Sequence, residues 1–225
     1  MASGRWDRTE TVGGFAAAAP NAVLLEWARA EQAQPGVRRV LDLGCGAARN
    51  AGPLAALGLE VIGTDLSAPM LAAARARVDA AGLGGRVHLV RAAMDALPLE
   101  AATADLVVAH GIWNLARSAA ELRRSLGEAA RVARPGAGLF VFTFSRHTLP
   151  ADAPPVSGER FVFAQFAGEP QVFLEEGELV AELAAAGFVR DPAGPLTEYN
   201  RPTAGRIQSG PVIWEGTFRR TGARS

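Results

Sequence analysis

The chain has 225 residues, of which 23 are acidic and 23 basic, so it carries no overall positive charge that would attract nucleic acid or an anionic membrane. All of the basic residues counted are arginine, and the absence of lysine excludes a Schiff base, a Walker lysine and a lysine general base. The single cysteine, Cys45, excludes an intrachain disulfide, a cysteine-only zinc site and a three-cysteine iron–sulfur cluster, and we expect no bound metal.

The chain begins with an irregular arm and a helix. Residues 1–14 mix polar residues with glycine, so we expect an arm that is mobile or draped over the core, and Trp6 favours partial docking. Residues 20–34 have apolar side chains at helical spacing and stop at Pro35, which predicts a helix. No charged-then-apolar leader is present, and no apolar run reaches the roughly 20 residues that cross a bilayer, so we expect a cytoplasmic protein.

From residue 37 onward, apolar strands alternate with amphipathic helices. Ser67 is placed to cap one helix, and Ser118 with Glu121 forms the signature of a capping box at the start of another. The predicted strands are residues 39–43, 60–65, 87–91, 105–110 and 139–145. Three helices are predicted between them: one that ends at residue 57, one at 67–80, and one that begins at 118 and ends at the stop signal at 134–136. This order predicts an α/β fold with a doubly wound, mostly parallel sheet and helices on both faces.

The last part of the chain interrupts and then completes this pattern. Residues 146–174 carry Pro150, Pro154 and Pro155 and then a short alternating run, so we expect a lid-like insertion over the active edge. A helix at 175–186 follows, and then a broken strand within 188–199 and a strand at 212–219. We therefore expect an N-terminal arm with its helix at 1–36 and one domain at 37–225.

The turn after the first predicted strand is the most informative segment. Asp42 precedes two closely spaced glycines, Gly44 and Gly46, so the backbone turns tightly and a ligand can approach without Cβ atoms in the way. A dinucleotide fingerprint needs a third glycine where Arg49 stands, which makes a nicotinamide dehydrogenase the weaker reading. The segment instead resembles motif I of the class I S-adenosylmethionine (SAM) methyltransferases, with Ala48 at the third glycine.

This resemblance implies a seven-stranded Rossmann-like sheet whose last strand is antiparallel, with SAM as cofactor. Asp42 would reach toward the ammonium group of the methionine portion, and Asp65, which ends the next apolar run, would accept hydrogen bonds from both ribose hydroxyls. The leading helix at 20–34 would cover the cofactor pocket. The other cofactor contacts predicted from this resemblance are Gly44, Cys45, Gly46, Leu66, Met70, Met94, Asp95 and His110.

Ala93 departs from the family pattern, and Arg49 has a second explanation. Where the family places an adenine-binding aspartate this chain has Ala93, so Asp95 would act as a displaced carboxylate beside the Met94 amide. Arg49 with Asn50 resembles a subset of small-molecule and metalloid methyltransferases, but Arg49 is equally explained as a solvent-facing residue in the first turn of a helix.

The residues that follow the fourth and fifth strands are the candidates for chemistry, because ligands bind beyond the carboxyl ends of parallel strands. His110 is a candidate general base, since a neutral imidazole can take a proton from the acceptor as the methyl arrives, or else it orders the loop. Trp113, Asn114 and His147 are candidate substrate contacts, with core packing or loop formation as the alternatives.

These observations predict SAM-dependent methyl transfer to an O, N or S atom of a small molecule. The residues at 110–113 lack the Asn/Asp-Pro-Pro-aromatic motif of the family's nucleic-acid amino-methyltransferases, which disfavours methylation of a base. A SAM-binding module without turnover and an RNA or protein methyltransferase are the alternatives. We expect a small-molecule partner, no nucleic acid and no membrane; the sequence leaves the oligomeric state open.

Overall fold

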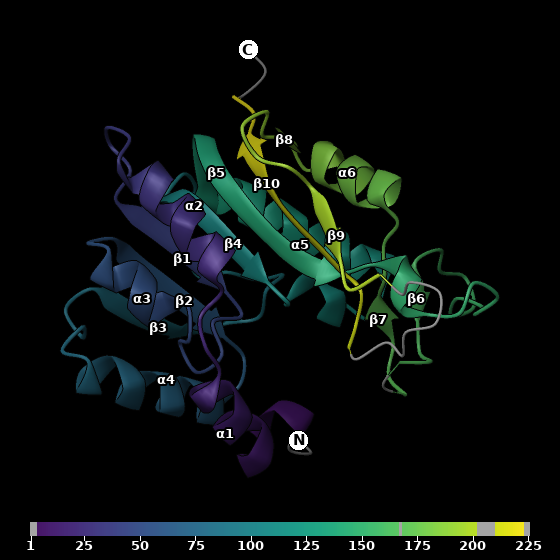
Figure 1. Ribbon diagram of the computed structural model, residues 1–225, viewed down its shortest axis with the longest axis horizontal. Helices are drawn as coiled ribbons and strands as arrows, with labels where there is room; N and C mark the ends of the chain where they lie inside the picture. The colour runs from purple at the N-terminus through teal and green to yellow at the C-terminus, as the bar shows by residue number, and fades with distance from the viewer. Residues whose placement is uncertain (1–3, 167, 202–209, 223–225) are drawn as a thin grey trace.

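The computed structural model describes residues 4–166, 168–201 and 210–222, and one sheet organises them (Figure 1). The strands of this sheet are β1 (Arg39–Leu43), β2 (Glu60–Asp65), β3 (Val87–Arg91), β4 (Ala104–His110), β5 (Ala133–Phe144), β8 (Phe188–Arg190), β9 (Thr197–Tyr199) and β10 (Ile213–Arg220). Their order is β3-β2-β1-β4-β5-β10-β8, and β9 also pairs with β10. The first three strands have the predicted bounds.

The sheet is parallel from β3 to β5 and antiparallel beyond it. Strands β8 and β9 pair with different parts of β10: Arg190 lies opposite Phe218, whereas Glu198 lies opposite Trp214. They therefore fill one edge position in two pieces, as expected for a broken strand. The predicted Rossmann-like, mostly parallel sheet is confirmed, with one extra strand that results from this break.

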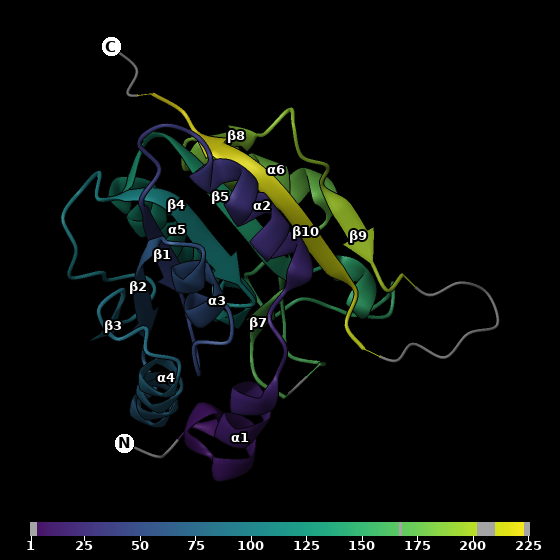
Figure 2. The same ribbon diagram turned by 60° about the vertical axis from the view of Figure 1, so that its left-hand side comes forward.

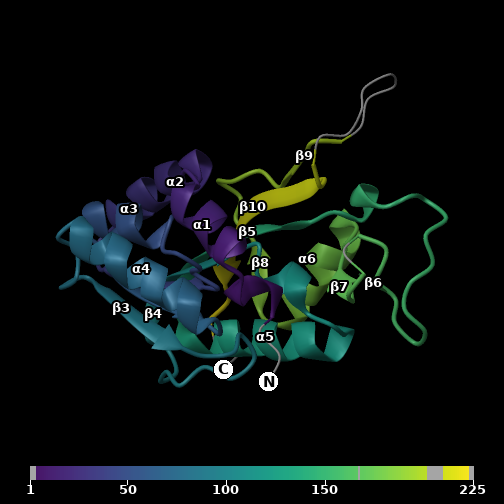
Figure 3. The same cartoon turned by 90° about the horizontal axis from the view of Figure 1, so that it is seen from below.

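Helices cover both faces of the sheet (Figure 3). On one face lie α2 (Ala22–Gln32), α3 (Ala51–Ala56) and α4 (Ala68–Ala80), which pack with Leu106 and Phe140; on the other lie α5 (Ala119–Val132) and α6 (Glu176–Ala185), which pack with Val107 and Leu139. Neighbouring strand residues thus serve opposite cores, as the pleat requires. Each fully buried leucine contributes about 1.5–3 kcal/mol to this packing.

Side-chain caps fix where the helices begin. Ser67 accepts a hydrogen bond from the amide of Met70 at 3.2 Å, and Ser118 accepts one from Glu121 at 3.1 Å, as predicted. The return bond of the expected capping box goes elsewhere, because the Glu121 carboxylate accepts from the amide of Arg117 at 2.7 Å. Capping of this kind stabilises a helix by about 1 kcal/mol.

The N-terminal arm is helical, which the sequence did not indicate. It contains η1 (Arg5–Asp7) and α1 (Thr9–Ala17), and α1 lies beside α4 (Figure 2). The Ser67 hydroxyl donates to Asp7 Oδ1 at 2.7 Å, and the rings of Trp6 and Phe15 meet edge to face with their centroids 5.7 Å apart. Since α1 contains two glycines and no buried residue, these tertiary contacts stabilise it more than helix propensity does.

Two other regions differ in detail from the sequence pattern. Strand β5 begins directly at Ala133, where a helix was expected to continue, and Arg134 pairs with Asp105 at 2.5 Å. The expected insertion contains η3 (Arg146–Thr148) and an antiparallel pair, β6 (Val162–Phe163) and β7 (Gln171–Val172). Its role as a lid stays a prediction. None of the helices in the described ranges is long and apolar enough to cross a bilayer.

A buried ion cluster ties α2 to the antiparallel edge of the sheet. Arg219 donates to Glu31 Oε2 at 2.8 Å and to Asp191 Oδ2 at 2.7 Å, and each of these two acids is 6% exposed. Replacing Arg219 with Met should lower the free energy of unfolding by about 3 kcal/mol, because two buried carboxylates lose their cation. Urea denaturation measures this loss.

The matched control is Arg190→Met. Its partner is Glu176, and the two side chains are 47% and 51% exposed, so the loss should stay below about 1 kcal/mol. Equal effects of the two substitutions would contradict the structural role of the Arg219 cluster.

Candidate active site

A glycine turn joins β1 to α3 and lies against the loop after β4. Gly44 and Gly46 have φ angles of 64° and 52°, in the left-handed region that glycine tolerates. A Cβ on Gly44 would lie 2.6 Å from Ile112 Cδ1, so a side chain there would displace the loop that follows β4. Ala48 also has a positive φ, 58°, which costs alanine about 1–2 kcal/mol and shows that the backbone keeps the path of a glycine there.

The Asp65 carboxylate connects the end of β2 to this turn. Its Oδ2 accepts a hydrogen bond from the Gly46 amide at 2.9 Å, and its Oδ1 accepts one from the Ser67 amide at 2.8 Å. Burial raises the pKa of Asp65, while hydrogen bonds from the amides of Ser67 and Gly46 oppose that increase. The carboxylate therefore lies at the junction of two strand ends, where a bound polar ligand would meet it.

Asp42 is a buried carboxyl group with an unsatisfied oxygen. It is 2% exposed, and its Oδ2 has no hydrogen-bond partner among the described residues. Burial raises its pKa to about 7, the positive charge of Arg49 opposes this, and the negative charge of Asp65 adds to it. An orphaned buried carboxyl oxygen costs free energy, which a cationic or N–H-bearing ligand would recover.

Three further predicted cofactor residues surround the turn. Cys45 is buried: its amide donates to Thr64 O at 2.9 Å, and its sulfur lies against Gly63, so its side chain points into the sheet. Met70 is 2% exposed and its sulfur lies 4.0 Å from the position of a Cβ on Gly46. Leu66, beside Asp65, is 63% exposed.

The two residues expected near the adenine lie after β3. Met94 is half-buried and packs against the core on the α5 face. Asp95 forms an ion pair with Arg124 of α5 at 2.9 Å, so its carboxylate already has a cationic partner. Binding of the adenine by Asp95 and Met94 stays a prediction, and this pairing argues against a free carboxylate at Asp95.

His110 lies between two hydrogen-bond donors at the end of β4. Its Nδ1 is 3.0 Å from Arg49 Nη2, its Nε2 is 3.2 Å from Asn21 Nδ2, and its ring stacks on Phe142 with the centroids 4.1 Å apart. Burial, and then the positive charge of Arg49, lower its pKa to about 3, so the ring is neutral at pH 7. Neither nitrogen offers a free lone pair here, and this arrangement argues against His110 as the general base.

The aromatic and amide residues after His110 are buried. Trp113 is 2% exposed within the core and Asn114 is 3% exposed; both lie on the short helix η2 (Trp113–Leu115). The indole nitrogen of Trp113 and Oδ1 of Asn114 have no partners in the described part of the chain. Trp113 therefore packs as a core residue, which was the alternative explanation, and its contact with a substrate stays a prediction.

His147 belongs to a polar cluster at the end of β5. Its Nδ1 lies 2.6 Å from Glu198 Oε1, which also accepts from the Ser145 hydroxyl, and its Nε2 lies 3.2 Å from Arg201 Nη2. Hydrogen bonds from Ser145 and His147 lower the pKa of Glu198 against the opposing effect of its burial. Because the Glu198 carboxylate is an acceptor, Nδ1 of His147 is the donor in this hydrogen bond.

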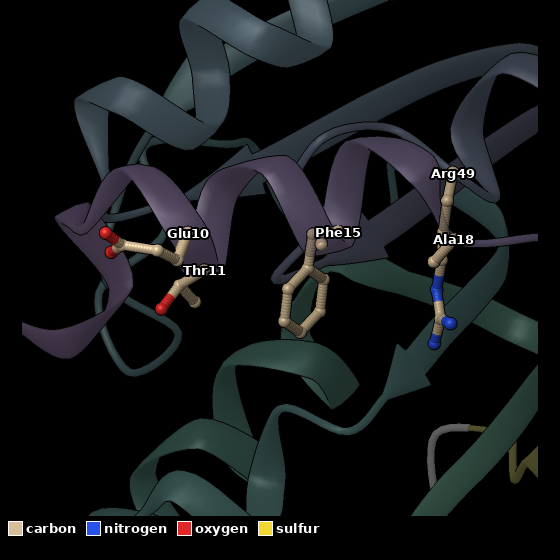
Figure 4. Close-up of a pocket in the computed structure, with 6 residues that line it drawn as sticks. Glu10, Thr11, Phe15, Ala18 and Arg49 are labelled. Atoms are coloured by element: carbon tan, nitrogen blue, oxygen red, sulfur yellow. The ribbon is translucent and has the colours of Figure 1, made fainter.

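Helix α1 forms one wall of a pocket beside the glycine turn (Figure 4). The pocket has a volume of about 410 Å³ and is lined by Glu10, Thr11, Gly14, Phe15, Ala18 and Arg49. Phe15 Cδ1 lies 3.5 Å from the position of a Cβ on Gly46, so its ring covers the turn. Arg49 lines this pocket and is half-buried, which argues against a purely solvent-facing role for it.

Several of these residues escaped the sequence analysis. Phe15 lies in the arm, Asn21 caps α2, and Glu215 is a buried acid of β10 that accepts from Asn21 Nδ2 at 2.7 Å. The cap was detectable, because asparagine precedes the apolar run of α2. The contact between Asn21 and Glu215 spans 194 positions and carries no local signal.

Comparison with known proteins identifies the family. A family profile described as a methyltransferase domain matches residues 40–136. The chain is 32% identical over 173 residues to a demethylmenaquinone methyltransferase of Thermus thermophilus, covering 67% of this chain and 74% of that protein. The chain belongs to the class I SAM-dependent methyltransferases. The predicted family, enzyme class and cofactor are therefore confirmed for this methyltransferase.

Other comparisons agree with this assignment. A ubiquinone/menaquinone biosynthesis C-methyltransferase of Syntrophotalea carbinolica is 38% identical over 123 residues, which are 53% of this chain and 49% of that one, so this methyltransferase spans about half its length. A solved SAM-dependent methyltransferase from Methanosarcina mazei shares the fold, with a TM-score of 0.70, 20% identity and coverage of 91% and 100%. The solved structure agrees in fold, and the matches to named methyltransferases support the predicted transfer of a methyl group to a small molecule.

The raised pKa of Asp42 predicts a pH dependence of stability. Its pKa is about 7 in the fold, against about 3.9 in an unfolded chain. Between those values the folded state holds the proton that the unfolded state has lost, so this group lowers stability as the pH rises from about 4 to 7. The free energy of unfolding of the parent chain should therefore fall by on the order of 2–4 kcal/mol between pH 5 and 8 because of this group, and Asp42→Asn should abolish that fall. Urea denaturation at both pH values measures it.

Comparing Asp42→Asn with the parent chain separates the contribution of Asp42 to the pH dependence from those of other groups. His110, whose pKa is lowered to about 3, titrates in both proteins and favours the folded state at higher pH, the opposite direction. If Asp42→Asn and the parent chain lose the same stability between the two pH values, the carboxyl group is not buried as described.

Proposed function

We propose that this methyltransferase binds SAM at the carboxyl ends of β1, β2 and β4 and transfers its methyl group to a small aromatic acceptor. The observation that carries the cofactor site is the Asp65 carboxylate, with one oxygen on the Gly46 amide and the other on the Ser67 amide, at 2.9 and 2.8 Å. A carboxylate oxygen has two lone-pair sites, so each can also accept a ribose hydroxyl.

The residues present fit this cofactor in charge. Asp42 Oδ2 is buried without a partner among the described residues, as a receptor for an ammonium group requires. Gly44 and Gly46 carry no Cβ, so the backbone of the turn can come close to a ligand, and Ile112, Phe15 and Met70 lie beside it. Asp65 would hold the sugar, and α1 with Phe15 would cover the bound molecule.

The protein's part in the reaction is positioning. The cofactor supplies a sulfonium methyl that is already electrophilic. Asp42, Asp65 and the glycine turn would fix that end, while α1 and the insertion would exclude water from the acceptor side. Alignment of two reactants in one site can supply several kcal/mol, with an upper range of about 7–11 kcal/mol.

Aromatic side chains beyond β5 support a planar, apolar acceptor. Phe144 stacks on Phe173 and meets Phe166 edge to face, with both pairs of centroids 5.3 Å apart. Phe166 is 43% exposed and Tyr199, across β10, is 42% exposed, so one surface of this cluster is open. Stacking on such rings suits an aromatic molecule, and several relatives are named for quinones.

His147 would contact the acceptor rather than take its proton. It lies on η3 just after β5, its Nδ1 donates to Glu198 at 2.6 Å, and its Nε2 lies 3.2 Å from the donor Arg201 Nη2. Like His110, it therefore has no free lone pair in this arrangement. Asn114 would contact the acceptor through its Oδ1, which has no partner within the described ranges.

Loss of the sugar-binding carboxylate should weaken the cofactor. Asp65→Asn should reduce the affinity for S-adenosylhomocysteine by roughly 10- to 100-fold, because hydrogen bonds to a charged group contribute about 1.5–3 kcal/mol. Isothermal titration calorimetry measures it. The control is Asp79→Asn, an exposed acid of α4 paired with Arg75 at 4.0 Å. Unchanged binding to Asp65→Asn would remove the basis of the cofactor site.

An acceptor panel tests the second half of the proposal. Hydroquinones and phenols should yield S-adenosylhomocysteine on incubation with SAM, and aliphatic alcohols, amines and carboxylic acids of similar size should not. Product formation is followed by mass spectrometry. Turnover confined to the aliphatic compounds would contradict the aromatic acceptor, and cofactor binding without any turnover would favour the binding-module alternative.

A further inference from the structure

An acidic and a basic side chain, Asp42 and Arg49, flank the glycine turn without forming an ion pair. Asp42 Oδ2 has no hydrogen-bond partner, and Arg49 has no carboxylate within 4.0 Å in the part of the chain described. They are near enough that each shifts the pKa of the other toward its charged form. A buried carboxylate and a half-buried guanidinium that do not pair with each other can each take an oppositely charged ligand group.

Among the residues that the structure describes, the groups that contact Arg49 carry no negative charge. Its polar contact is to the neutral His110, at 3.0 Å, and its guanidinium carbon lies 6.0 Å from the centroid of Phe15. A second guanidinium, that of Arg77, lies close enough to lower the pKa of Arg49 further. Arg77 donates to Ala18 O at 3.4 Å, and its Nη1 is buried without a partner in the described ranges.

The same guanidinium faces the pocket under α1. Figure 4 shows the Arg49 side chain extending past Ala18 in the same direction as the Phe15 ring, and both line the pocket of about 410 Å³. The planar guanidinium with its several N–H groups matches a carboxylate in a bidentate manner, which lysine cannot do. An anion entering this pocket would meet Arg49 beside the glycine turn.

We propose that Arg49 binds the α-carboxylate of the cofactor's amino-acid portion and that it leaves His110 to do so. This inference rests on the proposed SAM site and deepens it. Asp42 on one side of the turn and Arg49 on the other would then recognise the two ends of a zwitterionic amino acid. Each of the two side chains would then gain an oppositely charged partner.

The exchange also resolves a conflict at His110. Arg49 Nη2 and Asn21 Nδ2 are both donors, and they face the two ring nitrogens of His110. The amide of Asn21 cannot be flipped, because its Oδ1 accepts from the Leu24 amide at 2.9 Å and its Nδ2 donates to Glu215 at 2.7 Å. A neutral imidazole accepts at only one nitrogen. Once Arg49 leaves, Nε2 accepts from Asn21 and Nδ1 carries the proton, so His110 becomes a second donor toward the carboxylate.

A pair of ligands that differ by one carboxylate tests this proposal. The probes are S-adenosylhomocysteine and its decarboxylated analogue S-adenosyl-3-thiopropylamine, titrated calorimetrically into the full chain. The parent chain should prefer S-adenosylhomocysteine by roughly 10- to 100-fold, as expected for a charge-assisted hydrogen-bonded pair of about 1.5–3 kcal/mol. Arg49→Ala should lose this preference and bind the analogue within about twofold of the parent.

The controls separate this proposal from the cofactor site itself. Arg86→Ala, an exposed arginine that donates to Gly58 O at 3.0 Å on the far side of β2, should keep the full preference. If neither ligand binds the parent chain, the SAM site fails. If both ligands bind the parent equally, or Arg49→Ala weakens both alike, the SAM site stands and the role of Arg49 is overturned.

A second measurement covers the case in which Arg49→Ala fails to fold. Nitrogen-15 NMR of the imidazole in the parent chain should show the His110 proton moving from Nε2 to Nδ1 on addition of S-adenosylhomocysteine, and no such change with the decarboxylated analogue. The same tautomer with and without S-adenosylhomocysteine would overturn the proposal.

Discussion

The hydrogen bond from the Gly46 amide to Asp65 Oδ2, at 2.9 Å, is the constraint on which the site depends. It joins the turn after β1 to the end of β2, and the second oxygen of the same carboxylate fixes the start of α4 through the Ser67 amide. Because β1 and β2 are parallel neighbours, both ends lie at one edge of the sheet. A single side chain thereby sets the shape of the ligand-facing turn.

The arm and the glycine turn form one unit around that bond. Ser67, which donates its amide to Asp65, donates its hydroxyl to Asp7, and Phe15 of α1 covers Gly46. Beside the turn, Asp42 Oδ2 has no hydrogen-bond partner among the described residues, and Arg49 contacts the neutral His110. The turn is thus fixed in its backbone, and a ligand that supplies partners for Asp42 and Arg49 would stabilise the fold.

The core of the fold was predictable because buried parallel strands read as continuous apolar runs, and the bounds of β1, β2 and β3 followed from them. Helix α1 was not, since it has no apolar face that packs in the core. In the site, the acids and glycines were predictable because they form a local motif. The hydrogen bonds of His110 were not, because its donors Asn21 and Arg49 are 89 and 61 positions away in the sequence. These donors argue against the role as a general base that its place after β4 suggested.

A crystal structure of the chain with S-adenosylhomocysteine tests the central claim most directly. Both ribose hydroxyls should lie within hydrogen-bond distance of the Asp65 carboxylate, with the amino-acid portion between the glycine turn and the end of β4. A nucleoside bound at another edge of the sheet, or an Asp65 carboxylate that contacts the Gly46 and Ser67 amides and no ligand atom, would contradict the account.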